Sequence, residues 1–432
     1  MNDGRKKSGL GLMSLVALGA GSAIGVSIFS VLGPAARVAG TGLLLSLVLA
    51  SCPMALFALC YADLGRRYPV SGASYEWPRR YLHPAIGFSV AWMRIVANIG
   101  AMIVLASVLV GYLSPYVKLP HSLTIFVVIS SIFAINSVGV RISGYIQTIL
   151  MVLLLVVLFA FTIGGSTVAN WNTLAVTSGH GPMGVLAAVA IMVSLFMGIE
   201  APVELGDEIR DARHTIPKAI VISILLTAIV YGAVASTTLA LIGPEDLGRS
   251  QAPLADASAR IWGHFAGAVI AGVAVISLLK SMNATAMVFS RMIFAMSRGG
   301  VLPVYLSHLH PRYGTPYRAT VVAALLSLSG LLLPGSLVFL LLAVNVPTLL
   351  KYMACCASAI RASRMDPTGA DGLLSPSSVL VAGVSAIIMA SAMVVFSVWE
   401  DWRPVALVGA WLIGGAVWYR LFVRDVRMNY PG

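Results

Sequence analysis

Long apolar segments recur along the whole sequence, and they constrain the fold more than any single motif. The 432-residue chain is 59% hydrophobic and only 10% charged, which excludes an ordinary water-soluble domain. About 20 apolar residues span the roughly 30 Å hydrocarbon core of a bilayer as a helix. We therefore predict an all-α integral membrane protein. Twelve transmembrane helices are expected, over residues 10–33, 40–64, 86–114, 121–139, 144–165, 183–209, 218–243, 264–297, 318–334, 335–360, 377–398 and 403–423.

The basic residues predict the orientation of these helices. A net charge of +12 suggests a nucleic-acid partner in a soluble protein, but here most of the Lys and Arg fall on alternate connections, such as those holding Arg66, Arg79 and Arg361. The positive-inside rule assigns such connections to the cytoplasm. We expect a multi-pass protein of the cell inner (plasma) membrane, in contact with lipid and with no nucleic acid. The tails 1–9 and 424–432 are both expected to be cytoplasmic.

Three glycines stand in the middle of the first apolar segment, at Gly19, Gly21 and Gly25. Each costs roughly 0.5–1 kcal/mol relative to alanine inside a helix, so their clustering predicts an interrupted helix with open backbone. Open backbone in a bilayer is tolerated only where it is buried in protein or lines a cavity. The run is therefore a candidate binding site. The alternative is that Gly21 and Gly25 merely allow two helices to pack closely.

The sixth apolar segment shows a similar irregularity. Gly198, Glu200 and Pro202 lie within a turn and a half, and a proline removes a helical hydrogen bond and clashes with the preceding turn. This helix should also break. The two broken helices would head two five-helix blocks, 10–165 and 183–360. Such a pair is typical of secondary transporters built from inverted repeats, with the substrate bound at the midplane.

Charged side chains inside predicted spans are candidates for coupling or gating, because they are costly to bury in a membrane. They are Arg94, Glu200, Glu204, Lys280 and Lys351. Arg94 can alternatively extend to the interface. Desolvation favours the neutral form of Glu200 unless Lys280 or Lys351 holds it ionised, so protonation should be linked to the state of the sixth helix.

Lys280 is the least explained of these charges. It lies about 16 residues, or roughly 24 Å of helix rise, into the eighth span, too deep for easy snorkelling. One hypothesis is a structural ion pair with Glu200 or Glu204. Another is a lipid-facing residue that reaches the outer interface. A third is that Lys280 titrates during transport or contacts an acidic group of the substrate.

Four motifs in chain order resemble the amino acid, polyamine and organocation (APC) superfamily of secondary transporters. The first is Gly21-Ser22-Ala23-Ile24-Gly25-Val26-Ser27-Ile28-Phe29, with Ser27 where a glycine is usual. The others are Asp63-Leu64 with Pro69, Gly72 and Tyr75; Met197-Gly198-Ile199-Glu200 followed by Glu208 and Ile216-Pro217-Lys218-Ala219-Ile220; and Ser290-Arg291 through Pro303. Ala212 replaces a proline of the family pattern. The likeness covers about residues 9–425.

The resemblance implies a five-plus-five inverted repeat with two further helices at 377–423, alternating access, and amino acids or their amines as substrates. It implies no cofactor and no metal, and leaves open a monomer or a homodimer. The substrate carboxylate would meet the backbone around Ser22, Ala23, Ile24 and Gly25. The carbonyls near Phe196, Met197, Gly198 and Ile199 would meet its amino group, as expected for the ends of half-helices. Side chains of Asn98, Thr285 and Asn345 would face the same region.

Two departures from the family affect the expected mechanism. Some proton-coupled members carry a lysine in the fifth helix, where this chain is aliphatic near Leu154. Some exchangers of cationic substrates carry a tryptophan in the sixth helix, where this chain has Ser194. Proton coupling through a fifth-helix lysine therefore cannot be assumed for this chain, and neither can stacking of a substrate guanidinium group on a sixth-helix tryptophan.

Other classes of function were weighed against an amino acid transporter. A membrane enzyme would need acid clusters or a His/Asp pair in a span, yet the seven histidines are dispersed. A channel or receptor would lack saturable uptake with counterflow. A polyamine or organic cation transporter is the main alternative, but its site needs several acids, and only Glu200 and Glu204 lie at depth. Proton symport and exchange both remain open, as does the identity of the amino acid.

Overall fold

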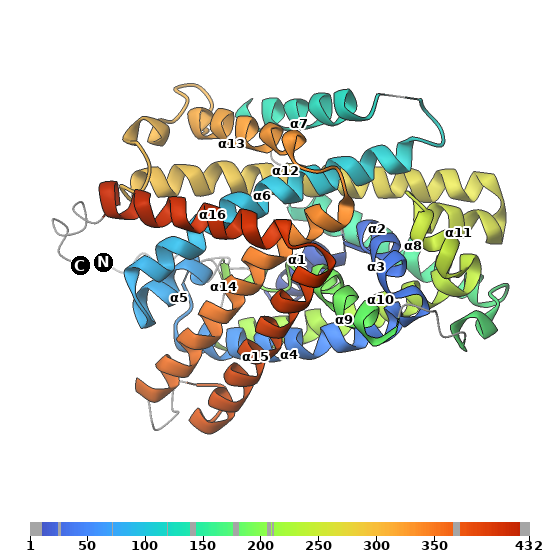
Figure 1. Cartoon of the computed structure of the whole chain (residues 1–432). Helices are drawn as coiled ribbons and strands as arrows, with labels where there is room; N and C mark the ends of the chain where they lie inside the picture. Colours follow the sequence, from blue (N-terminus) through green and yellow to red (C-terminus); the bar gives the residue numbers. More distant parts are fainter. Residues whose placement is uncertain are drawn as a thin grey trace.

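The computed structural model describes residues 11–24, 27–70, 72–118, 120–138, 144–175, 181–204, 209, 211–365 and 372–423. The long elements in these ranges are all helices, and most of them run roughly parallel or antiparallel to one another (Figure 1). Gly25 and the two predicted cytoplasmic tails lie outside the described residues.

Nine helical stretches among the described residues are long and apolar enough to cross a membrane. They comprise α3 (Leu32–Ala39) running into α4 (Leu43–Arg67), α6 (Pro84–Leu113), α7 (His121–Val138), α8 (Gly144–Ser166), α10 (Ala212–Arg249), α12 (His264–Arg298), α14 (Leu337–Met365), α15 (Pro376–Glu400), and α16 (Arg403–Trp418) with the π-helix η8 (Tyr419–Val423). Shorter apolar helices occupy the other three predicted segments, at Leu12–Gly21, Gly181–Phe196 and Tyr317–Leu332. The segments are therefore helical where predicted, whereas twelve crossings remain a prediction.

The first apolar segment contains α1 (Leu12–Ile24), α2 (Ser27–Ser30) and α3, and residues 25–26 between α1 and α2 lie outside the described residues, so a break at that point stays a prediction. The helix α1 runs unbroken through Gly19 and Gly21. The predicted opening of the backbone therefore does not occur at these two residues. Close packing accounts for both: a Cβ on Gly19 would lie 2.7 Å from Ser223 Oγ, and one on Gly21 would lie 2.8 Å from Met151 Sδ. Small residues here let α1 approach its neighbours, as in the alternative interpretation.

The sixth apolar segment breaks, as predicted, but not at its proline. The helix α9 (Gly181–Met192) tightens into the 3₁₀ turn η3 (Val193–Phe196). Met197 is then extended, and Gly198 has φ 105°, a conformation that L-residues with a side chain rarely adopt. Pro202 follows only in the next 3₁₀ turn, η4 (Ala201–Glu204). The break is therefore set by the glycine.

The long helices pack as a bundle around these interruptions. The helix α10 contacts α1, α3 and α4, while α6 contacts both α12 and α14. The short helices α5 (Ala73–Tyr81) and α11 (Pro253–Trp262), which lie between predicted spans, sit at opposite ends of this bundle (Figure 1). The break in the sixth segment lies within the bundle, where Val193 to Phe196 are buried, so its backbone is shielded from lipid by neighbouring helices.

The remaining described helical turns connect these elements. The helix α13 (Tyr317–Ser329) continues into the 3₁₀ turn η7 (Gly330–Leu332), and α10 is kinked at Gly243, where φ is 76°. The other 3₁₀ turns are η1 (Gly40–Gly42), η2 (Trp171–Ala175) and η6 (Val304–Ser307).

The Asp63 of the second predicted motif has a structural role at the end of α4. Its buried carboxylate accepts a 2.6 Å hydrogen bond from Arg67 Nε and backbone hydrogen bonds from Leu373 (2.8 Å) and Leu374 (3.1 Å). The pair therefore anchors the connection between α14 and α15 to the second apolar segment. Backbone N–H groups that are buried in a loop need such an acceptor.

Candidate functional site

A partly open cavity of about 340 Å³ with several polar residues in its lining lies between the first and sixth apolar segments. It is bounded by α1, α2, α6, the stretch Ser194–Glu200, α12 and α14. Its volume is in the range of small-molecule sites. Its polar lining consists of Ser27, Ser30, Arg94, Asn98, Ser194, Glu200, Lys280, Ser281, Thr285, Thr348 and Lys351.

Glu200 and Lys351 form a buried ion pair on the cavity wall. Lys351 Nζ donates a 2.8 Å hydrogen bond to Glu200 Oε1, and the two side chains are 8% and 13% exposed for the lysine and the glutamate. The other carboxylate oxygen, Oε2, accepts a 2.9 Å hydrogen bond from the backbone N–H of Gly198. Glu200 therefore stabilises the broken backbone and connects it to α14. A buried carboxylate with a charged partner and a backbone donor is held ionised.

Serine hydroxyls join the first apolar segment to the break in the sixth. Ser27 Oγ, in α2, donates a 2.6 Å hydrogen bond to the carbonyl of Ser194. Ser194 Oγ in turn donates to Asn345 Oδ1 (2.7 Å), and Asn345 Nδ2 donates to the carbonyl of Ala190 (2.7 Å). The serine that departs from the family glycine thus supplies the first bond of a chain linking α2, the break and α14.

Arg94 and Glu204 make a looser pair beside the cavity. Arg94 Nη1 lies 3.7 Å from Glu204 Oε1, which is beyond hydrogen-bonding distance. Arg94 is one turn from Asn98 on α6, and both line the cavity. The arginine therefore lines the cavity, and the alternative that it extends to the interface stays a prediction.

Lys280 reaches the cavity from the middle of α12. It is 5% exposed and lines the site together with Ser281 and Thr285. In the described part of the chain no carboxylate pairs with it, since Glu200 pairs with Lys351 and Glu204 with Arg94. The hypothesis of a structural ion pair between Lys280 and either acid is therefore wrong for this structure, and so is the hypothesis of a lipid-facing lysine.

The predicted site residues divide into those that line the cavity and those that do not. The lining residues are Arg94, Asn98, Met197, Gly198, Glu200, Lys280, Thr285 and Lys351. Ala23, Ile24, Phe196, Ile199 and Asn345 are buried but do not line it, and the half-buried Glu204 does not line it either. The carbonyl of Ala23 is occupied by a 2.6 Å hydrogen bond from the Tyr231 hydroxyl. Ser22 is in α1, but its side chain, like Gly25, is outside what the structure describes.

Several lining residues were not among the predicted site residues. Ser27, Ser30, Ser281 and Thr348 are small polar residues in otherwise apolar helices. Their signal in the sequence is weak, because serine and threonine often bond to their own helix in a membrane. Ser27 and the further lining residue Ser194 carried a recognisable signal, each as a departure from a family pattern.

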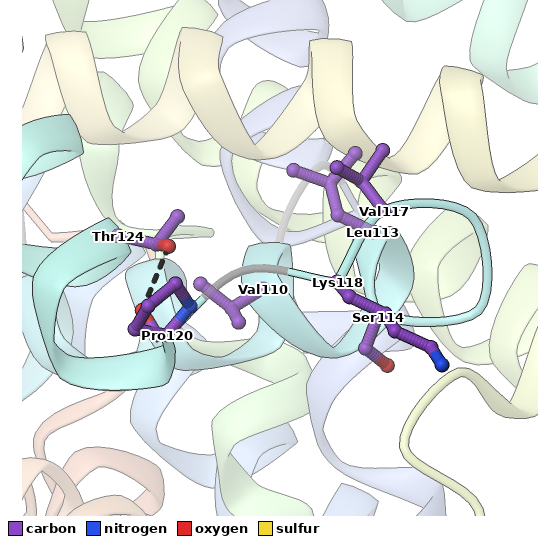
Figure 2. Close-up of a pocket in the computed structure, with 7 residues that line it drawn as sticks. All are labelled: Val110, Leu113, Ser114, Val117, Lys118, Pro120 and Thr124. Atoms are coloured by element: carbon purple, nitrogen blue, oxygen red, sulfur yellow. Dashed lines mark hydrogen bonds between the residues drawn. The ribbon is translucent and has the colours of Figure 1, made fainter.

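A second hollow, of about 470 Å³, lies at the surface where α6 leads into α7 (Figure 2). Its lining, from Val110 to Thr124, is mostly apolar and contains one charge, the exposed Lys118. None of its lining residues comes from either interrupted segment. The central cavity is therefore the better candidate site.

An apolar helical bundle with a broken sixth segment beside a cavity lined by charged residues is the arrangement of a multi-pass membrane protein with an internal small-molecule site. The sequence model described as amino acid permease matches residues 10–415. The chain therefore belongs to the amino acid permease family, within the APC superfamily. This confirms the family expected from the four motifs.

Several curated relatives are also named as transporters. An uncharacterized transporter of Mycobacterium tuberculosis is 33% identical over 315 residues, which cover 72% of this chain and 71% of the relative. A branched-chain amino acid permease of Bacillus subtilis is 27% identical and covers 97% of this chain and 93% of the relative. Human cationic amino acid transporter 4 is 27% identical, covering 84% of this chain and 61% of the relative.

Proposed function

We propose that this protein moves amino acids across a cell membrane by alternating access, binding them in the central cavity. The observation that carries the proposal is that one cavity is bounded by both the first and the sixth apolar segments, through Gly21 and Ser27 on one side and Met197 and Gly198 on the other. Broken helices at the midplane present unpaired backbone groups to a zwitterion. The names of the Bacillus and human relatives also favour amino acids.

The substrate carboxylate would lie at the first break, near residues 22–25, and its amino group near the carbonyls of residues 196–198. In the second break part of the backbone is already bonded: the Gly198 N–H is held by Glu200, and the carbonyl of Ser194 by Ser27. The Met197 carbonyl, beside the positive-φ Gly198, is the better candidate for an ammonium group. Asn98 and Thr285 would contact the remaining polar atoms.

The architecture that goes with this function is a five-plus-five inverted repeat, 10–165 and 183–360, followed by α15 and α16 as scaffold. The positive-inside rule favours cytoplasmic termini. Glu200 with Lys351, and Arg94 with Glu204, would act as coupling or gating pairs. They connect the sixth segment to α14 and α6 respectively, so relative movement of these elements would break or remake them.

The charge of the cavity disfavours the alternative, a polyamine or organic cation transporter. Three of its lining residues are basic, Arg94, Lys280 and Lys351, and one is acidic, Glu200. Because Glu200 is already paired with Lys351, it has no free charge to offer a polycation. A polyamine site needs several free acids facing the ligand.

Counterflow in proteoliposomes tests the proposal. Liposomes holding purified protein and one unlabelled amino acid should take up the labelled form transiently above equilibrium. Met197→Trp fills the cavity wall and should abolish counterflow. Met183→Trp places the same bulk at a 52% exposed position on α9 and should not. Failure of every amino acid in a full panel to show saturable counterflow would contradict the proposed function.

A further inference from the structure

Lys280 is a buried cation that faces the cavity without an acidic partner. It lies 16 residues after the start of α12, near the middle of a 35-residue helix, and is only 5% exposed. It lines the cavity. No carboxylate within the described ranges lies within 4.0 Å of its ammonium group. A charge buried at such depth normally has a partner or a function.

The acids near the cavity are committed to other bases. Glu200 pairs with Lys351 at 2.8 Å, and Glu204 lies 3.7 Å from Arg94. Among the described residues, these five groups contain three bases and two acids, so they carry an excess of one positive charge when all five are ionised. That excess is located at Lys280.

The helix that carries Lys280 supplies hydrogen-bond donors to an anion. Ser281 and Thr285 are its polar cavity-lining neighbours on α12, and Asn98 on α6 lines the same cavity further along, next to Met292. The Asn98 amide nitrogen makes only a 3.9 Å contact with Met292 Sδ, a weak acceptor. Hydroxyl donors near an ammonium group form a suitable environment for a carboxylate, and the Asn98 amide remains available to another part of the same ligand.

We propose that the substrate brings the missing negative charge, so that this transporter selects amino acids with an acidic side chain. A zwitterionic amino acid has no net charge and would leave the excess positive charge in place. An amino acid of net charge −1 would neutralise it, with its side-chain carboxylate on Lys280 and its backbone groups at the two breaks. This inference rests on the proposed function, because it assigns a substrate class to the same cavity.

The test compares acidic amino acids with their neutral isosteres. Purified protein is titrated with L-glutamate, L-glutamine, L-aspartate and L-asparagine, and binding is measured by ligand-dependent thermal stabilisation and by competition in counterflow. The wild type should bind glutamate or aspartate at least about tenfold more tightly than the matching amide, because a charge-assisted contact contributes more than a neutral one. Lys280→Met should remove this preference by weakening only the acidic ligand. Lys280→Arg should keep part of it.

Lys118→Met is the matched control, since Lys118 is exposed in the surface hollow and does not line the cavity (Figure 2). It should leave the preference unchanged. A wild type that binds the amides as well as the acids overturns the inference even if Lys280→Met does not fold. The inference is also overturned if Lys280→Met still prefers acidic amino acids to their amides and loses only the ability to accumulate substrate against a gradient. In that case the lysine couples transport to an ion and does not select the substrate. Transport of neutral amino acids alone would refute the acidic selectivity and leave the proposed function standing. Absence of counterflow with any amino acid would refute both.

Discussion

The hydroxyl of Ser27 donates a 2.6 Å hydrogen bond to the carbonyl of Ser194, joining two interrupted segments that are 167 positions apart in the chain. A glycine, the usual residue of the related motif, has no side chain to make this bond. The donor is therefore a particular feature of this chain. It gives α2 and the second break a common position on the cavity wall.

Ser27→Ala should weaken this connection without emptying the site. The Ser194 carbonyl keeps a 3.3 Å backbone partner in Met197, so the loss should be about 1 kcal/mol of unfolding free energy. Chemical denaturation in mixed micelles measures the loss. Ser391→Ala is the control, because Ser391 bonds only to Ile387 within its own helix. Equal effects of the two substitutions would show that the inter-segment bond contributes nothing.

The positive φ of Gly198 predicts a larger effect. Gly198→Ala forces a side chain into a conformation that costs about 1–3 kcal/mol and should either destabilise the protein or close the break. Transport should fall in both cases. Gly272→Ala, at an open position in α12, should be neutral or stabilising. If Gly198→Ala transports normally, the observed backbone of the break is not required.

Much of the architecture could be predicted because membrane helices leave a strong signal in composition. The bounds of α7, for example, are 121–138 against a prediction of 121–139. The break in the sixth segment was also predicted, although Gly198 and not Pro202 sets its position. Both residue types disrupt helices, and the sequence does not tell which one the chain uses.

The contacts inside the cavity were harder to predict. Glu200 pairs with Lys351 across 151 positions, and nothing in the spacing distinguishes Lys351 from Lys280 as its partner. Phe196 and Ile199 flank the break but pack into the protein, because the regular period of side chains is lost where the helix opens. Asn345 is used in bonds to Ser194 and Ala190. Such choices depend on how helices far apart in sequence face one another.

Asp401 predicts a pH dependence of stability in the short connection before α16. The side-chain hydrogen bond from Arg403, 2.8 Å from Nε to Oδ1, lowers the pKa of the Asp401 carboxyl below its usual value. A lowered folded-state pKa gives stability that is complete above the unfolded-state pKa of about 4 and is lost as the pH falls through the folded value. Asp401→Asn should therefore flatten the acid side of the stability profile. The melting temperature is measured from neutral pH to about pH 3.

The control for this experiment is Asp246→Asn. Asp246 is exposed and lies 3.9 Å from Arg260, too far for a hydrogen bond. An acid profile unchanged by Asp401→Asn, or changed equally by both substitutions, would contradict a specific role for Asp401.

The buried pair of Glu200 and Lys351 makes the strongest prediction about stability. Glu200→Gln keeps an acceptor for the Gly198 N–H but removes the acidic partner of the Lys351 charge. Lys351→Met removes the basic partner of the Glu200 carboxylate. Each single change should cost about 3–5 kcal/mol, because an unpaired charge stays buried. The double variant should recover most of that loss, since neither charge remains. Denaturation of the four proteins gives the coupling energy directly.

Glu76→Gln and Arg79→Met provide the matched cycle. These residues form a 3.0 Å pair on α5 with side chains 25% and 46% exposed, so their coupling should be below about 1 kcal/mol.

Transport adds a second measurement to the cycle of Glu200 and Lys351. If the pair opens and closes during alternating access, the stable double variant should bind substrate yet exchange it with an altered pH dependence. Additive losses in the buried cycle would mean that the two charges do not stabilise each other, and an unchanged pH profile would remove the pair from the transport mechanism.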